Sequence, residues 1–275
     1  MKTIPIRYSL FFTLILLVLY PIDGMGQDEI DVIPSLKDKN VIFVYGGWEG
    51  HKPSESMELM VPKLRAEGAN VKIFDSLSIY TNEKLLVQTD LIVQTWTMGK
   101  LSKEQFKGLE KAIMNGTGFS GWHGGMGDAF RDNLKYQFMV GGQFVSHPGG
   151  NIDHSIKILD KTDPITKGLN DFDLKKTEQY YMLIDPNIKV LAISEFDRES
   201  YQKPGKPENK VTGSTMPVVW KKNYGKGRIF FSSIGHKLGD FEVPEVMSIQ
   251  MRGFRWAAEG KYMEEESTIT PVYKK

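Results

Sequence analysis

The sequence of 275 residues contains no cysteine. This absence excludes disulfide bonds, thiolate zinc sites, a cysteine nucleophile and a bacterial lipoprotein anchor. Charge is also balanced, because 35 lysines and arginines face 34 aspartates and glutamates. A net charge of +1 gives no support for nucleic acid as a partner. Hydrophobic residues at 40% and charged residues at 25% are typical of a globular protein and exclude a disordered or fibrous chain.

Several catalytic and cofactor motifs are missing as well. No G-x-G-x-x-G or P-loop spacing follows the first predicted strand, so nothing indicates a nucleotide cofactor. Residues Gly118–Trp122 (GFSGW) contain Gly-x-Ser but lack the second glycine of a nucleophile elbow, which argues against a Ser-His-acid hydrolase. No H-E-x-x-H spacing is present either. The chemistry must therefore come from another set of residues.

The N-terminus differs from the rest of the chain. Lys2 and Arg7 precede an apolar run that ends at Ile22, and small residues follow at Gly24 and Gly26. This three-part pattern predicts a secretory signal peptide over residues 1–26, with a mature protein that is secreted or periplasmic. The alternative is an uncleaved anchor, but the run is shorter than the ~20 residues of a membrane span, so we expect no stable membrane anchor.

Residues 40–260 are expected to form one domain, after a lead-in over residues 27–39 and before a polar tail over residues 261–275. Short apolar runs alternate with amphipathic stretches in its first half, and one helix is expected to be capped by Ser54 and another to open with a capping box at Ser102. This alternation predicts an α/β protein with a mostly parallel central sheet covered on both faces. The expected strands are Asn40–Tyr45, Asn70–Phe74, Leu91–Thr95, Gly118–Trp122, His154–Ile158, Val190–Ser194, Pro217–Trp220 and Arg228–Ser232. A surface loop is expected over residues 198–215 and a closing helix over Glu245–Glu259.

The chain has five histidines, and three of them, His51, His123 and His236, come just after a predicted strand. In a parallel sheet such strand ends meet at one edge, where ligands bind. His147 lies in a glycine-rich segment and is expected to join the same cleft, whereas His154 lies inside a strand. Histidine side chains gathered at one edge favour acid–base chemistry or metal binding.

Other polar and aromatic residues accompany these histidines. Aromatic rings beside polar groups suit the C–H faces of sugar rings, and glycines allow close approach to the main chain. The residues that we expect to bind substrate are Gly47, Trp48, Glu49, His51, Trp96, Gly124, His147 and Tyr180. Glu178 offers a carboxylate next to the two tyrosines that follow it. Core packing and tight turns remain the alternatives for the aromatic and glycine positions.

Five segments together resemble the trehalose-utilisation (ThuA-like) family over roughly residues 40–260. They are Val41–Gly47 with His51, Gly118–His123, Asp163–Leu169, Gly227–His236 and Arg255–Gly260. The resemblance implies a flavodoxin-like three-layer sandwich, similar to the class I glutamine amidotransferases. In those enzymes a cysteine occupies the elbow where this sequence has His123, so the resemblance implies no glutaminase activity here. The family often has histidine where this chain has Asp163, which leaves that position without an expected role.

The resemblance also implies a function, because the family is associated with the breakdown of disaccharides through 3-keto sugars. We therefore expect an exported enzyme that acts on an oxidised (3-keto) glycoside or related carbohydrate by histidine acid–base chemistry. His123 is the expected acid–base group, with His236 as its partner and Glu178 as a further catalytic candidate. Two alternatives stay open: a zinc-dependent hydrolase with His51, His123 and His147 as metal ligands, and a non-catalytic sugar-binding protein with the same cleft. The expected partner is a small carbohydrate. Whether the protein needs a divalent metal such as zinc, and whether it forms a homo-oligomer, is left open by the sequence.

Overall fold

The computed structural model describes residues 33–197 and 211–262. The expected signal peptide lies outside the described residues, as do residues 27–32 of the lead-in, most of the 198–215 loop and all but the first two residues of the tail. Within the described chain, no helix combines the length and the apolar character needed to span a membrane.

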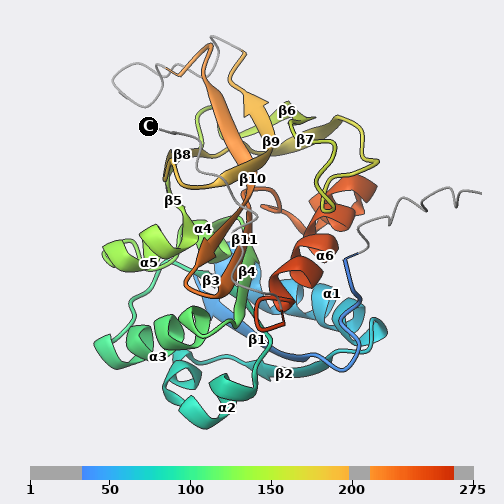
Figure 1. The fold of residues 1–275 in the computed structure, drawn as a ribbon. Coiled ribbons are helices and arrows are strands. Elements are labelled where there is room, and N and C mark those ends of the chain that lie inside the picture. Colours follow the sequence, from blue (N-terminus) through green and yellow to red (C-terminus); the bar gives the residue numbers. More distant parts are fainter. Residues whose placement is uncertain (1–32, 198–210, 263–275) are drawn as a thin grey trace, which may run out of the picture. The chain divides into compact units, whose positions relative to one another are not determined.

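Nine strands of the described chain form one sheet, in the order β2-β1-β3-β4-β11-β10-β9-β6-β7 (Figure 1). The first five pair in parallel; they are β2 (Asn70–Phe74), β1 (Asn40–Gly47), β3 (Leu91–Thr97), β4 (Gly118–Trp122) and β11 (Gly227–Ser232). The last four strands are β10 (Thr215–Tyr224), β9 (Lys189–Glu195), β6 (Asn151–Ile158) and β7 (Phe172–Glu178). Each is antiparallel to its neighbours in the sheet, and β10 is also antiparallel to β11. Every residue of β4 and β11 is buried, as expected for strands covered on both faces.

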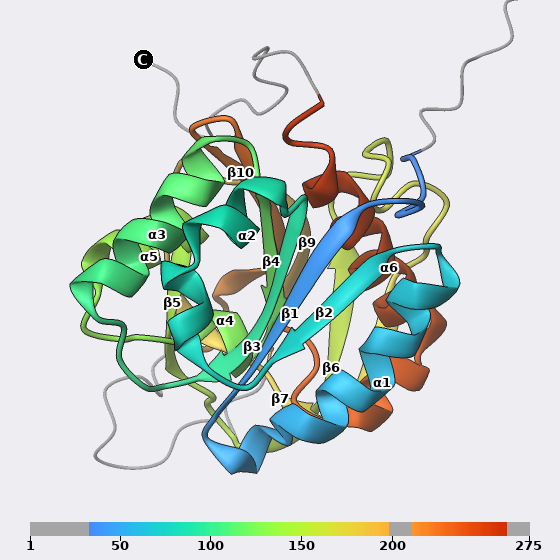
Figure 2. The same cartoon turned by 90° about the horizontal axis from the view of Figure 1, so that it is seen from below.

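Helices cover both faces of the sheet, as Figure 2 shows. On one face lie α1 (Pro53–Ala66) and α6 (Pro244–Ala258), whose Met60 and Phe254 belong to one hydrophobic core. On the other lie α2 (Glu83–Gln88), α3 (Lys103–Met114) and α5 (Leu134–Val140), whose Leu109 and Met139 belong to a second core. Two cores separated by one sheet make the predicted flavodoxin-like three-layer α/β sandwich, which is confirmed.

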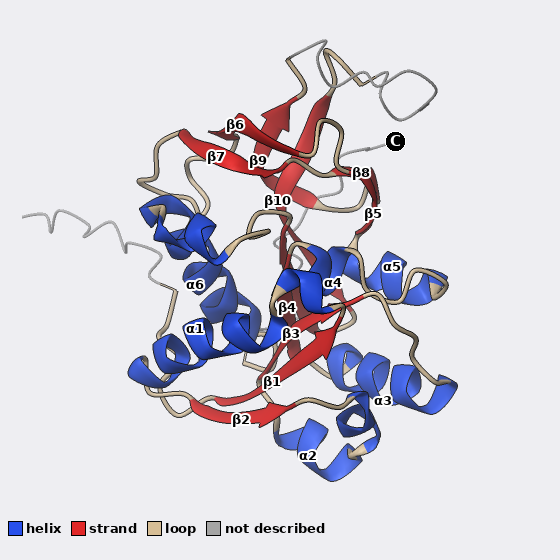
Figure 3. Cartoon of the chain, turned by 180° about the vertical axis from the view of Figure 1, so that it is seen from behind, coloured by secondary structure: helices blue, strands red, loops and turns tan. Residues whose placement is uncertain are grey.

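The antiparallel part of the sheet was less apparent in the sequence. Figure 3 shows it at the end of the sheet away from α2 and α3, beside a two-stranded sheet of β5 (Gly142–Ser146) and β8 (Tyr181–Ile184). The sequence analysis missed β5, β7 and β8. Exposed polar and charged residues interrupt the buried ones along β7, so this strand has no continuous apolar run to reveal it.

The two helix starts predicted from the sequence have different outcomes. Ser102 and Gln105 form the expected capping box at the start of α3. The expectation that Ser54 caps α1 is wrong, because the helix begins at Pro53 and Lys52 precedes it in a left-handed conformation (φ +49°). Proline suits the first helical position, since its fixed φ is already helical and its missing N–H would have no partner there.

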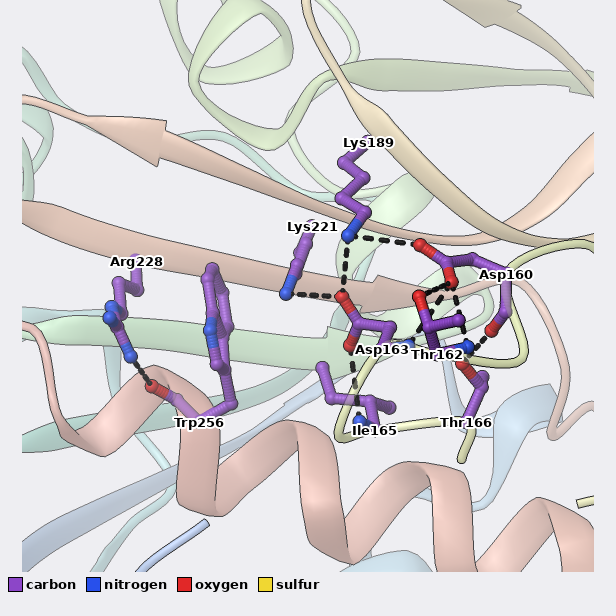
Figure 4. Close-up of polar contacts among 9 residues, drawn as sticks. All are labelled: Asp160, Thr162, Asp163, Ile165, Thr166, Lys189, Lys221, Arg228 and Trp256. Atoms are coloured by element: carbon purple, nitrogen blue, oxygen red, sulfur yellow. Dashed lines mark hydrogen bonds and ion pairs between the residues drawn. The ribbon is translucent and has the colours of Figure 1, made fainter. Parts of the chain in front are cut away.

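A paired network of charges joins β9 and β10 to the loop that follows β6 (Figure 4). The Asp163 carboxylate accepts from Lys189 Nζ at 2.9 Å and from the almost fully buried Lys221 Nζ at 2.5 Å. Its other oxygen accepts the backbone N–H of Ile165, and Lys189 also pairs with Asp160 at 3.0 Å. Burial lowers the pKa of Lys221, although Asp163 opposes that shift. Asp163, for which the sequence indicated no role, therefore holds two lysines.

Candidate functional site

Four side chains from different parts of the chain meet beyond the ends of strands. His51 lies in the 3-10 turn Glu49–His51 after β1, His123 directly follows β4, His236 comes four residues after β11, and Glu178 is the last residue of β7. Their nitrogen and oxygen donor atoms all lie within 4.8 Å of one another. We call these four residues the histidine centre. The structure thus brings together the three histidines that the sequence placed at strand ends, and adds the carboxylate.

His123 occupies an elbow in the backbone between β4 and the short helix α4 (Gly124–Gly127). Its φ of +46° and ψ of −140° are strained for any residue with a Cβ atom, and such strain concentrates at functional sites. The ring is buried, and its Nδ1 donates to the carbonyl oxygen of Ser233 at 2.9 Å. Tyr180 lies against one face of this ring, with 3.9 Å between centroids. The Nε2 atom is therefore fixed toward the centre.

Glu178 is the shared partner of three histidines. Its Oε2 lies 3.2 Å from Nε2 of His123 and 3.3 Å from Nδ1 of His236, and its Oε1 lies 3.4 Å from Nε2 of His147. Burial raises the pKa of Glu178, but the hydrogen bond with His123 and the charges of the surrounding histidines outweigh burial, so that its pKa is lowered overall. Glu178 is consequently a carboxylate at neutral pH.

The other two imidazoles of the centre favour their neutral forms. Burial, followed by repulsion from His123 and His236, lowers the pKa of His51 to about 3. Burial and His123 also lower the pKa of His236. His51 Nδ1 lies 2.9 Å from the Thr97 hydroxyl oxygen, whereas the buried Nδ1 of His236 has no hydrogen-bond partner. These rings present nitrogen lone pairs rather than positive charge.

Aromatic groups stand beside the centre. Trp48 is 49% exposed and meets the His51 ring edge-on at 4.8 Å. Phe144 packs against Tyr180 and stacks on His147, whose side chain is 42% exposed. Trp48 and His147 are therefore both accessible beside the centre, and they are placed to meet a ligand that approaches from solvent.

The remaining residues expected from the sequence lie in several environments. A Cβ atom on Gly124 would be 2.3 Å from the His51 ring, so this glycine makes room for the histidine. Gly47 is required by packing, because a Cβ atom there would be 2.1 Å from the Thr97 carbonyl oxygen. Glu49 is exposed in the turn that carries His51. Trp96 packs against Gly46, on the opposite side of β3 from Thr97, and its indole nitrogen has no hydrogen-bond partner.

Sequence reasoning missed the groups that hold these residues in place. Thr97 and Ser233 orient two of the histidines, but neither residue type has a sequence signal for that role. Arg131 forms a two-pronged contact with the buried carboxylate of Asp128 and lies 5.7 Å from the Phe144 ring centre. A spacing of three residues between Asp128 and Arg131 was the available signal for that pair.

A cavity of about 10 Å³ lies behind the histidines, lined by Ser56, Thr95 and Thr97 together with His51 and His123. This volume is close to the minimum for one water molecule, and the buried Thr95 hydroxyl that faces no other partner would suit one. Taken together, the centre offers a carboxylate, lone-pair nitrogens and a half-exposed histidine, which are the groups used for proton transfer or for binding a cation.

Comparisons with known proteins point in one direction. The family model described as trehalose utilisation (ThuA) matches residues 40–257. The fold is similar to a ThuA-like protein from Bacteroides uniformis ATCC 8492, with 17% identity, a TM-score of 0.65 and coverage of 81% of this chain and 92% of that one. It is also similar to a ThuA-like protein from Parabacteroides merdae ATCC 43184, with 18% identity, a TM-score of 0.64 and coverage of 86% and 96%. Among curated protein sequences no match is found.

Proposed function

The chain belongs to the trehalose-utilisation (ThuA) family, and from that premise we propose that it is an exported enzyme that cleaves an oxidised (3-keto) glycoside at the histidine centre. Trehalose is a glucose disaccharide, so the favoured substrate is a disaccharide of glucose in which one sugar carries a 3-keto group. The observation that carries the proposal is the Glu178 carboxylate, which three histidines contact at 3.2–3.4 Å.

The proposed reaction needs no net oxidation or reduction. The ketone at C3 makes the C2 proton acidic, and a base removes that proton to give an enolate. The enolate then expels the anomeric oxygen by breaking the C1–O bond, and the leaving sugar takes up a proton. Water adds to C1 of the resulting enone while C2 regains a proton, so the sum is hydrolysis of the glycoside. Such a reaction requires an electrophile at the ketone oxygen, a base and an acid.

The residues at the mouth of the site suit the proton transfers. His147 is half-exposed, and its Nε2 lies 3.4 Å from Glu178 Oε1, so the carboxylate can orient the ring. His123, which the sequence analysis chose as the acid–base group, is buried, and both of its ring nitrogens are engaged. We therefore assign the contact with the C2 proton to His147, and the electrophilic side of the reaction to the buried part of the centre.

The aromatic rings suit the sugar. A half-exposed indole at Trp48, beside His51, offers a flat apolar face to the C–H groups of a pyranose ring. Phe144 and Tyr180 support His147 and His123 from the other side. This arrangement favours a sugar lying between Trp48 and His147, with its ketone toward the centre.

The test uses untagged protein and the 3-keto derivative of trehalose in D2O. We expect free glucose and 3-ketoglucose to appear in the NMR spectrum, with deuterium at C2 of the keto sugar, and no turnover of native trehalose. His154→Ala is the matched control, because His154 lies within β6 and should leave the rate unchanged. Tight binding of keto sugars without any cleavage would instead identify a sugar-binding protein and overturn the proposal.

A further inference from the structure

We propose that His51, His123, His236 and Glu178 together bind one divalent transition-metal cation, for which zinc is the natural probe. The binding site stands on its own geometry. Only the role that we give the cation, polarising the ketone oxygen, rests on the proposed function.

The spacing of the donor atoms matches a metal coordination shell. Zinc binds histidine nitrogen and carboxylate oxygen at about 2.0–2.2 Å, so two donors in a tetrahedral shell lie about 3.3–3.5 Å apart. Glu178 Oε2 lies 3.2 Å from His123 Nε2 and 3.3 Å from His236 Nδ1, and all four donor groups fall within 4.8 Å. The side chains therefore need only small movements to surround one ion.

The hydrogen bonds around the centre orient the rings as metal ligands. His123 Nδ1 donates to the Ser233 carbonyl oxygen, which leaves a lone pair on Nε2 when the ring is neutral. The Nδ1 atom of His51 contacts the Thr97 hydroxyl, and when Nδ1 donates to that oxygen the lone pair lies on Nε2. Metal-bound histidines commonly engage their second nitrogen in this way, which fixes the tautomer and the ring direction. His236 adds a buried Nδ1 with no hydrogen-bond partner, 3.3 Å from the carboxylate.

The charge of the centre also calls for a cation. Among the described residues, the ion-pair contacts of Glu178 are with His123, His147 and His236, and none is with lysine or arginine. A partly buried carboxylate that has histidines but no lysine or arginine beside it can accept one divalent ion at a single point.

The donor types select the class of metal. Three imidazoles and one carboxylate suit zinc and its first-row neighbours, whereas calcium and magnesium prefer shells of oxygen. This ligand set differs from the one expected from the sequence, because His236 and Glu178 take part and His147 does not. His147 instead faces the second carboxylate oxygen, which leaves it free for the proton transfer. An ion bound in this way would have to take the ketone oxygen as a fifth ligand, and it would then supply the electrophile that the proposed reaction needs.

The experiment measures binding without any sugar. Untagged protein is treated with chelator, and isothermal titration with Zn²⁺ is followed by elemental analysis, with Mg²⁺ and Ca²⁺ as negative controls. We expect one Zn²⁺ per chain. Glu178→Gln and His236→Gln should each weaken binding at least tenfold, in the range known for losing a supporting or direct ligand. His147→Ala and His154→Ala should bind zinc as the parent does, and circular dichroism confirms that each variant is folded.

The outcomes separate this proposal from the function. Absence of stoichiometric Zn²⁺ binding by the folded parent overturns the site. Loss of binding in His147→Ala, with binding kept in His236→Gln, overturns this ligand set in favour of the one expected from the sequence. Zinc binding with the expected variant pattern, but no turnover of 3-keto glycosides, supports the site while it refutes the proposed function.

Discussion

Glu178 is a partly buried carboxylate and Asp163 a fully buried one, and they have different partners. Asp163 meets two lysine ammonium groups and a backbone N–H, in a network where the charges of Asp160 and Asp163 balance those of Lys189 and Lys221 (Figure 4). Glu178 meets three histidines instead. Burial lowers the pKa of one of them, His236, and also the pKa of His51 in the same centre, so both rings resist protonation. One cluster is complete as it stands, whereas the other is completed by a ligand.

The difference shows how the fold separates stability from chemistry. In the Asp163 network every strong donor has its acceptor, so the network joins β9, β10 and the loop before Ile165. The histidine centre instead contains a strained elbow at His123, a buried His236 nitrogen without a hydrogen bond and a carboxylate whose ion-pair contacts are with histidines alone. Such costs are typical of functional sites, where removing the chemistry often raises stability.

Glu178→Gln should give the largest difference between the effect on activity and the effect on stability. The amide keeps the shape of the side chain but removes its charge and its basicity, so we expect turnover to fall by about 10²–10⁴-fold. The melting temperature of the metal-free protein should fall less than that of Asp163→Asn, because the amide keeps the shape of the side chain and leaves no buried lysine without a partner. Rate measurements with a 3-keto glycoside and calorimetric melting check both parts; a marked fall in melting temperature would contradict the comparison.

Asp163→Asn should show the reverse pattern. Lys221 is almost fully buried, and without its carboxylate partner its charge would be uncompensated, which costs about 3–5 kcal/mol of unfolding free energy. Turnover per folded molecule should be unchanged. Urea unfolding measures the loss, and Lys189→Met is the milder control because Lys189 is about one-third exposed. Equal loss of activity and stability would show that the two clusters are coupled.

Acid should act first on the histidine centre of the metal-free protein. The unfolded chain takes up protons on histidine near pH 6.5, whereas folded His51 does so only near pH 3. Between these values the unfolded state binds more protons, so stability falls as the pH decreases, by up to about 1.4 kcal/mol per unit for this histidine. His51→Gln should flatten that slope in urea unfolding measured at pH 7, 6 and 5 with chelator present.

The Asp163 network provides the contrast in the same experiment. Burial raises the pKa of Asp160, but hydrogen bonds from Thr162 and Lys189 outweigh burial and lower its pKa below the usual 3.8. The contribution of this carboxylate is present above pH 3.8 and is lost only as the pH falls through its lowered value. If the unfolding free energy of His51→Gln fell between pH 7 and 5 as steeply as that of the parent protein, the acid sensitivity could not be assigned to the histidine centre.

The smallest effect is expected from the elbow itself. Both His123→Gly and His123→Ala remove the imidazole, but only glycine tolerates a φ of +46° with a ψ of −140° without strain. We therefore expect the glycine variant to be more stable than the alanine variant by about 1–2 kcal/mol. Urea unfolding of the pair measures the difference, and alanine proving as stable as glycine would show that the elbow stores no strain.

Much of the parallel half of this fold could be predicted from the sequence. The bounds expected for β2 and β4 are those observed, because both are short segments between clear turn signals. The rule that parallel strands end at one edge of the sheet is enough to predict that His51 and His123 lie there together. Local pattern and a general topological rule were sufficient for that part of the site.

The rest depended on contacts between distant segments. Glu178 was a weak candidate because β7, which carries it to the centre, has no apolar run. The pairing of Asp163 with Lys221 joins residues 58 positions apart, and no local pattern announces it. The zinc ligand set expected from the sequence included His147. Which oxygen of Glu178 each histidine faces depends on how distant segments pack, and no local sequence pattern indicates it.

The position of β11 has a consequence for how the protein is made. It lies between β4 and β10 in the sheet, yet it is the last of the sheet strands along the chain. During synthesis from the N-terminus, β4 therefore emerges long before its neighbour and presents an open edge. Ser232 and Ser233, which bond the backbone and ring of His123, arrive together with β11, and His236 follows a few residues later. The centre can form only when nearly the whole chain has left the ribosome, so cation binding would report a completely folded molecule.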